Sequence, residues 1–142
     1  MTPRWLTGAE LRTARAMRRI LRRRFPLCFR PRGKSKWPLA RDVALQLMAR
    51  CPDLPGPEVA LALADYTRGM TYFRCLAAGA GRRNLDGALD GIVTDAEARA
   101  AALTLDRMIA HNHRQTTAAQ RAKIAAAMRV PEPPRKQRAM QP

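Results

Sequence analysis

Two histidines and three carboxylates are the first side chains to consider for catalysis. His111 and His113 would point about 200° apart on a helix, and no cysteine or acidic cluster accompanies them. We interpret them as solvated side chains near a helix end. Asp86 and Asp90 each precede a glycine, as tight turns favour, and Asp95 suits the positively polarised first turn of a helix. Structural roles therefore account for all five residues.

The three cysteines, Cys28, Cys51 and Cys75, lie far apart and form no C-x-x-C pair. This spacing predicts neither a disulfide framework nor a zinc site, and apolar neighbours favour small buried side chains. The glycines between residues 79 and 91 are not followed by Gly-Lys-Ser or Gly-Lys-Thr, as a phosphate-binding loop requires. We therefore predict a protein without catalysis, metal or other cofactor.

Positive charge is the feature that remains, since 27 Lys and Arg face 11 Asp and Glu, a net charge of +16. Residues 1–41 hold 13 basic residues and one acid, residues 42–128 hold ten and nine, and residues 129–142 hold four and one. A nearly neutral middle with basic flanks predicts a packed domain that presents a cationic surface to a polyanion. Nucleic acid and an anionic membrane surface are the two candidates, and the composition favours nucleic acid.

Basic residues interspersed with aromatic rings form the candidate contact set. An arginine can bind a phosphate through two hydrogen bonds and stack on a base, and a tyrosine ring can carry an unstacked base. The set comprises Arg30, Arg32, Lys34, Lys36, Trp37, Arg41, Arg68, Tyr72, Arg82 and Arg83. A solvated charged face, with Tyr72 in the core, is the alternative, and spacing alone does not separate the two interpretations.

An amphipathic helix should carry much of the N-terminal charge. Thr7 and Glu10 have the spacing of a capping box, which predicts a helix start. Apolar residues then recur every three or four positions as far as Phe25, and Phe25-Pro26 should end the helix. The opposite side holds Arg12, Arg15, Arg19, Arg22 and Arg23. One face of the helix should pack against the core, and the other face should carry the arginine side chains.

Two further helices and some extended chain should follow. Leu39, Val43 and Leu47 predict a helix that stops at residues 51–56, and residues 57–79 keep the helical period for five turns. We expect a short strand over residues 27–30 and a small hairpin between Gly79 and Thr94.

The C-terminal part should contain two helices and a tail. Thr94 begins a second capping box with a helix behind it, and residues 111–115 interrupt the apolar period. Thr117 offers a third capping box for a separate alanine-rich helix, and the proline-rich residues 131–142 should be disordered. The predicted fold class is mostly α with small β-hairpins (α+β). No apolar run approaches the roughly 20 residues of a membrane span, and no signal peptide is evident, so we expect a cytoplasmic protein.

A set of short motifs resembles the ProQ/FinO family of bacterial RNA chaperones in order and spacing. The motifs are Phe25-Pro26-Leu27-Cys28-Phe29, Trp37-Pro38-Leu39, Tyr66-Thr67-Arg68-Gly69 with Tyr72, Gly79-Ala80 with Arg82, and Asn84-Leu85-Asp86-Gly87. The resemblance covers residues 15–108. We accordingly assign residues 15–110 to a ProQ/FinO-like domain, residues 1–14 to a basic N-terminal helix start, residues 111–130 to a helical extension and residues 131–142 to a basic tail.

The resemblance implies a compact domain with a concave and a convex face. It also implies binding of structured RNAs, above all terminator hairpins with a single-stranded 3′ uridine tail. Such binding would stabilise small regulatory RNAs or messenger RNAs and promote pairing between them. We expect a monomer with RNA as partner, and no membrane or small-molecule substrate.

The resemblance places the RNA 3′ end in a pocket with Tyr72 and Arg82, and Thr67 as a further lining residue, while Tyr66 should mainly pack. Some positions depart from the family pattern, which commonly has basic residues or glycine where this chain has Ala40, Asp42, Ala60 and Ala64. We hypothesise that backbone contacts by Arg41, Arg68 and the helix arginines Arg15, Arg19, Arg22 and Arg23 compensate for the missing charge.

The alternative function is a basic helical DNA-binding regulator, with the arginine-rich helix in the major groove. That helix has no Asn or Gln among its arginines to recognise adenine, and no helix-turn-helix pattern surrounds it. A membrane-surface protein that uses the same helix is a third hypothesis. Its apolar face, however, should already be occupied by the core.

Overall fold

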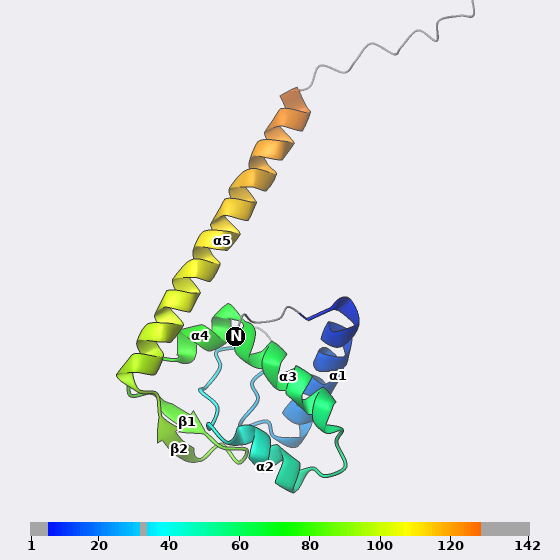
Figure 1. Ribbon diagram of the computed structural model, residues 1–142, viewed down its shortest axis with the longest axis vertical. Coiled ribbons are helices and arrows are strands. Elements are labelled where there is room, and N and C mark those ends of the chain that lie inside the picture. Colours follow the sequence, from blue (N-terminus) through cyan, green and yellow to red (C-terminus); the bar gives the residue numbers. More distant parts are fainter. Residues whose placement is uncertain (1–5, 32–33, 129–142) are drawn as a thin grey trace, which may run out of the picture. The chain divides into compact units, whose positions relative to one another are not determined.

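Helices and one short hairpin make up residues 6–31 and 34–128, the part of the chain that the computed structural model describes (Figure 1). In chain order the elements are α1 (Gly8–Arg24), α2 (Val43–Arg50), α3 (Gly56–Arg68), α4 (Met70–Cys75), β1 (Gly81–Arg83), β2 (Leu89–Ile92) and α5 (Asp95–Met128). A mostly helical fold with a small antiparallel sheet confirms the predicted fold class. The predicted disordered tail, residues 131–142, lies outside the described residues.

Two compact units divide the chain, Met1–Asp106 and Arg107–Pro142. All residues of the candidate site discussed below belong to the first unit. The finer division into segments at residues 14, 110 and 130 stays a prediction.

The core of the first unit forms where α1 lies beside α3, as Figure 1 shows. α1 starts at the predicted capping box, in which the Glu10 amide donates to Thr7 Oγ1 and the Thr7 amide donates to Glu10 Oε1. Its apolar face buries Met17 and Leu21, and α3 buries Tyr66 against the same cluster. Burial of this stripe leaves the arginines of α1 on the opposite side, as predicted.

The hairpin joins the core through the segment before α2. The Arg83 amide donates to the carbonyl of Pro38 and the Ala40 amide donates to the carbonyl of Arg83, both at 2.8 Å. Its turn uses Gly87 at φ +80°, where an added Cβ would lie 2.7 Å from the Cβ of Leu27. The predicted hairpin is confirmed, and it holds residues 81–92 against the chain that leads into α2.

The predicted strand over residues 27–30 is wrong. The amides of Cys28 and Phe29 both donate to the carbonyl of Phe25, at 3.1 and 3.0 Å, and this forms a turn. Both side chains are buried, whereas adjacent residues of a strand point to opposite faces. Two successive core residues therefore require a turn at this point.

The predicted five-turn helix is also wrong, because it breaks at Gly69. This residue has an extended backbone, with ψ 154°, between α3 and α4. Lys36 Nζ donates to the carbonyl of Tyr66 at 2.9 Å, which a continuous helix would offer to the amide four residues further on. A side chain from another segment thus takes the place of the helical partner.

The C-terminal helix is continuous where two helices were predicted. α5 runs from the second capping box, where the Glu97 amide donates to Thr94 Oγ1, through residues 111–115 without an end. Thr117 does not cap a new helix, since its hydroxyl donates to the carbonyl of His113 one turn back. Because residues 95–128 include no Pro or Gly, nothing in the sequence forces a break.

Alkaline pH should destabilise the fold through Cys28, which has no exposed surface. Burial raises the pKa of this thiol from 9.0 to about 12. Between these two pKa values the folded state keeps a proton that the unfolded state loses. The stabilising effect of the protonated thiol is therefore complete below pH 9 and disappears as the pH rises toward 12. We expect this thiol to remove about 2–3 kcal/mol of unfolding free energy by pH 11.

Urea unfolding between pH 8 and pH 11 measures this loss, and Cys28→Ala should have the shallower pH dependence. Some dependence should persist, because burial also raises the pKa of Cys75 to about 11 and that of Tyr66 to about 12. Equal slopes for the two proteins would show that the Cys28 thiol does not titrate differently in the folded and unfolded states.

Candidate functional site

The backbone of Leu39 brings the two principal predicted pocket residues together. Its amide donates to the Tyr72 hydroxyl at 3.2 Å, and its carbonyl accepts from Arg82 Nη1 at 2.8 Å. Tyr72 comes from α4 and Arg82 from β1, and each is only 7% exposed. Burial raises the pKa of the Tyr72 hydroxyl. Helix, hairpin and loop thus meet at one residue, which we call the Leu39 junction (Leu39, Tyr72 and Arg82).

A single carboxylate near the start of α5 extends the junction. Glu97 Oε2 accepts from Arg82 Nη2 at 2.6 Å, and Glu97 Oε1 accepts from Arg41 Nη2 at 2.5 Å. The same Oε1 accepts from the Thr94 amide in the capping box. The hydrogen bond from Arg41 is the main cause that lowers the pKa of Glu97 to about 2. Glu97 therefore stays charged and holds two arginines in fixed positions.

A hollow of about 240 Å³ lies beside this carboxylate. It is lined by Arg41, Asp42, Arg82, Asp90 and Gly91. Within the described residues, the buried Nε of Arg82 has no hydrogen-bond acceptor. A buried donor without a partner costs free energy, and because this nitrogen is buried, only the Arg82 atoms that line the hollow can meet a bound molecule.

Trp37 is contacted by two of the predicted basic residues. The guanidinium carbons of Arg30 and Arg83 lie 4.7 and 5.4 Å from the centre of its ring. Arg30 Nε also donates to the carbonyl of Ser35, and Arg83 Nη1 to that of Gly87. Cation–π contacts and backbone acceptors fix both guanidinium groups, and both remain partly exposed.

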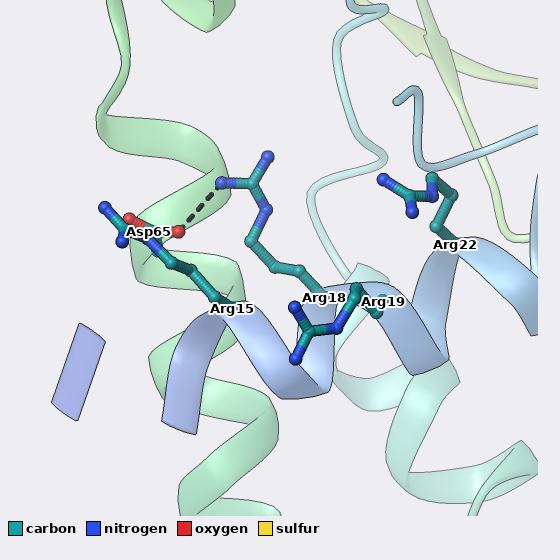
Figure 2. A pocket seen from close by; sticks show the side chains of 5 residues that line it. All are labelled: Arg15, Arg18, Arg19, Arg22 and Asp65. Atoms are coloured by element: carbon teal, nitrogen blue, oxygen red, sulfur yellow. Dashed lines mark hydrogen bonds and ion pairs between the residues drawn. The ribbon is translucent and has the colours of Figure 1, made fainter. Parts of the chain in front are cut away.

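The arginine face of α1 adjoins α3 (Figure 2). The side chains of Arg15, Arg18, Arg19 and Arg22 surround a hollow of about 250 Å³, with Asp65 of α3 as the one acid in its lining. Arg18 Nη1 pairs with Asp65 Oδ2 at 2.8 Å, and its guanidinium lies over the Tyr66 ring at 5.1 Å. One carboxylate thus faces four arginines, so the face keeps a large excess of positive charge.

Metal binding and membrane insertion find no support in the described part of the chain. Among residues 6–31 and 34–128, no group of three or more His, Cys, Asp or Glu could hold a metal ion. His111 and His113 are both exposed on α5. None of the helices over the same residues is long and apolar enough to cross a membrane.

A family model described as "ProQ/FINO family" matches residues 11–123. The chain belongs to this family. It is 39% identical over 66 residues to a protein named RNA chaperone ProQ from Shewanella baltica (strain OS223). That match covers 44% of this chain and 31% of the relative, so this chain spans less than a third of the relative's length.

Two solved structures share the ProQ/FINO fold. A FinO-like RNA chaperone from Neisseria meningitidis MC58 has a TM-score of 0.55 and 24% identity, over 65% of this chain and 73% of its own. A ProQ homolog from Legionella pneumophila has a TM-score of 0.55 and 19% identity, over 75% and 88%. Because both identities are below 25%, these two comparisons establish the fold of this chain alone.

The structure brings some of the predicted ProQ/FINO site residues together, and the others differ in their contacts and in their exposure. Tyr72 and Arg82 meet at the Leu39 junction, but Thr67 donates its hydroxyl to the carbonyl of Leu63 within α3. Among the predicted backbone contacts, Arg15, Arg19, Arg23, Lys34 and Arg41 are exposed, Arg22, Arg30, Arg68 and Arg83 are half-buried, and Lys36 is buried. Arg32 lies outside the described residues.

Four residues of these sites were missed by the sequence analysis. Glu97 was interpreted only as a capping residue, Asp65 and Arg18 were not singled out, and Leu39 was assigned to a helical stripe. A signal existed for Glu97, because the glutamate of a capping box can accept from other donors as well. The sequence held no such signal for Leu39, because its backbone groups, and not its side chain, bind Tyr72 and Arg82.

Proposed function

We propose that this chain is an RNA-binding chaperone that binds terminator hairpins with a single-stranded 3′ uridine tail. In this proposal the Leu39 junction binds the 3′ end, and the arginine face of α1 contacts phosphates of the stem. Binding would stabilise small regulatory RNAs or messenger RNAs and promote their pairing, in the cytoplasm, as a monomer and without a catalytic step.

The observation that carries the proposal is the juxtaposition of Arg82 and Tyr72 in a member of the ProQ/FINO family. Arg82 lines the adjoining hollow together with Arg41 as a second cation, and the same lining includes the carboxylates of Asp42 and Asp90. A guanidinium and a phenol can together hold the terminal phosphates and bases of an RNA strand. Both related proteins named above as chaperones are described as acting on RNA.

The arginine face of α1 supports stem binding in particular. Double-stranded RNA hides its base edges in a deep, narrow major groove, so proteins bind it through phosphates, 2′-hydroxyls and shape. α1 has arginines and no Asn or Gln, which suits phosphate contacts and not base recognition. The same residues favour a stem of RNA over a specific DNA sequence.

Removal of the 3′ tail should weaken binding by about tenfold or more, since one stacked base contributes about 1–3 kcal/mol. Affinity is measured for a tailed terminator hairpin, the same hairpin without its tail, and a DNA duplex, at two salt concentrations. Tyr72→Phe keeps the ring and loses only the hydroxyl that accepts from the Leu39 amide, so it should change the affinity for the tailed hairpin by less than removal of the tail does. Equal affinity of the natural chain for all three nucleic acids would overturn the proposal and leave only nonspecific attraction to phosphate.

A further inference from the structure

A second basic hollow lies between the segment before Trp37 and α4, apart from the Leu39 junction and the arginine face. Its volume is about 390 Å³. The lining residues are Lys34, Ser35, Lys36, Thr71, Arg74 and Cys75. They comprise three cations, two hydroxyls and a thiol, and no carboxylate. We call it the Lys36 hollow.

Lys36 gives the hollow a fixed and buried charge. The residue is 8% exposed, and its Nζ donates to the carbonyl of Tyr66 at 2.9 Å and lies 4.3 Å from the centre of the Tyr66 ring. An ammonium group has three hydrogen atoms to donate. One donor serves the Tyr66 carbonyl, so the group can also donate toward the hollow that Lys36 lines.

The remaining lining residues offer groups suited to an anion. Lys34 and Arg74 are exposed side chains that approach from the loop and from α4. The hydroxyls of Ser35 and Thr71 can each donate a hydrogen bond. Phosphate oxygens bind most strongly to charged donors, and a guanidinium can engage two of them at once. Three cations without a lining carboxylate favour an anion over a neutral ligand.

We infer that the Lys36 hollow binds a phosphate group, either of an RNA strand or of a small phosphorylated molecule. Where the phosphate belongs to RNA, the inference rests on the proposed function and adds a further contact to the arginine face and the 3′-end pocket of that proposal. A phosphate here would also bring negative charge to the buried ammonium, which donates to the Tyr66 carbonyl and lies over the Tyr66 ring.

Titration of the 142-residue chain with inorganic phosphate tests the site directly. Amide NMR signals of Ser35 and Thr71 should shift in a saturable way, and Arg74→Gln should weaken the binding by about tenfold, as expected for the loss of a charge-assisted hydrogen bond. Arg99→Gln, an exposed change of equal charge on α5, is the matched control and should leave the binding unchanged. Shifts that do not saturate, or an equal effect of both changes, would overturn the inference.

The pH dependence of phosphate binding gives a second readout that does not need a variant of Lys36. Burial lowers the pKa of Lys36 to about 8, while Arg18 and Asp65 face it as a cation and an anion. Cys75 and Tyr66, with pKa values raised to about 11 and 12, stay neutral up to pH 9.5. Binding should therefore weaken by at least about threefold between pH 7 and pH 9.5, although phosphate itself gains negative charge. An increase over this range would contradict the inference.

Binding experiments with the tailed hairpin distinguish the two sources of phosphate. If the ligand is RNA, Arg74→Gln weakens hairpin binding and inorganic phosphate competes with the hairpin for the natural protein. If the ligand is a small molecule, phosphate binds and the hairpin affinity of Arg74→Gln is unchanged. If phosphate does not bind the natural protein in a saturable way while its tail-dependent RNA binding is intact, the Lys36 hollow is refuted as a site. The proposed function still stands in that case.

Discussion

Replacement of Arg15, Arg19, Arg22 and Arg23 together by Gln is expected to weaken binding of a tailed terminator hairpin by about 100- to 1,000-fold at about 0.1 M salt. Removal of each arginine that binds a phosphate should also lower the slope of log affinity against log salt by about 0.7–0.9. Because Asp65 is the one acid among the described residues that line the hollow of this face, the positive charge of its arginines is available to RNA. Fluorescence anisotropy over a series of salt concentrations measures both quantities.

A matched variant carries the same change of charge on another surface. Arg99, Arg107, Arg114 and Arg121 are exposed on α5, and their combined replacement by Gln should change the affinity far less. The tail dependence should survive in the α1 variant, since the Leu39 junction is untouched. If both quadruple variants lost the same affinity, net charge alone would explain the binding and the arginine face would have no particular role.

Arg82→Leu is expected to reduce the free energy of unfolding by about 2–3 kcal/mol, because it leaves the Leu39 carbonyl buried without its donor. The loss of Nη2 also leaves Glu97 without its buried partner. Urea unfolding at neutral pH measures the change. The unfolding curve also identifies conditions in which the variant is folded. Its RNA affinity is compared with that of the natural chain under those conditions.

Arg41 provides the control for Arg82, since both bind the same carboxylate. The Arg41 side chain is 62% exposed, whereas that of Arg82 is 9% exposed. Exposed ion pairs contribute little to stability, so Arg41→Gln should reduce the free energy of unfolding by less than about 1 kcal/mol. A larger loss for Arg41→Gln than for Arg82→Leu would contradict the assignment of the structural role to Arg82.

Local signals in the sequence predicted much of this fold correctly. The capping boxes at Thr7 and Thr94 mark the starts of α1 and α5, and the apolar stripe of α1 faces the core. These features depend on residues within one or two turns of each other, so periodicity and capping chemistry suffice to find them. The Asp86-Gly87 turn similarly located the hairpin.

A contact between distant segments accompanies one of the predictions that failed, whereas the turn at Phe25 and the continuous α5 are local differences. The helix over residues 57–79 breaks at Gly69, a residue type that weakens a helix interior, and Lys36, thirty positions earlier, donates to the Tyr66 carbonyl beside the break. The interpretation of Tyr72 as either a core or a contact residue was left open by its spacing. In the structure its ring is buried and its hydroxyl binds Leu39, so its role toward RNA stays a prediction.

Glu97 also bears on how the chain folds during synthesis. Its carboxylate neutralises Arg41 and Arg82, which are translated 56 and 15 positions earlier. While the ribosome has delivered only the first ninety residues, these guanidinium groups lack their counter-ion and Arg82 cannot be buried without one. The Leu39 junction therefore closes late, after α5 has begun to leave the exit tunnel, even though α1 and α3 can already pack.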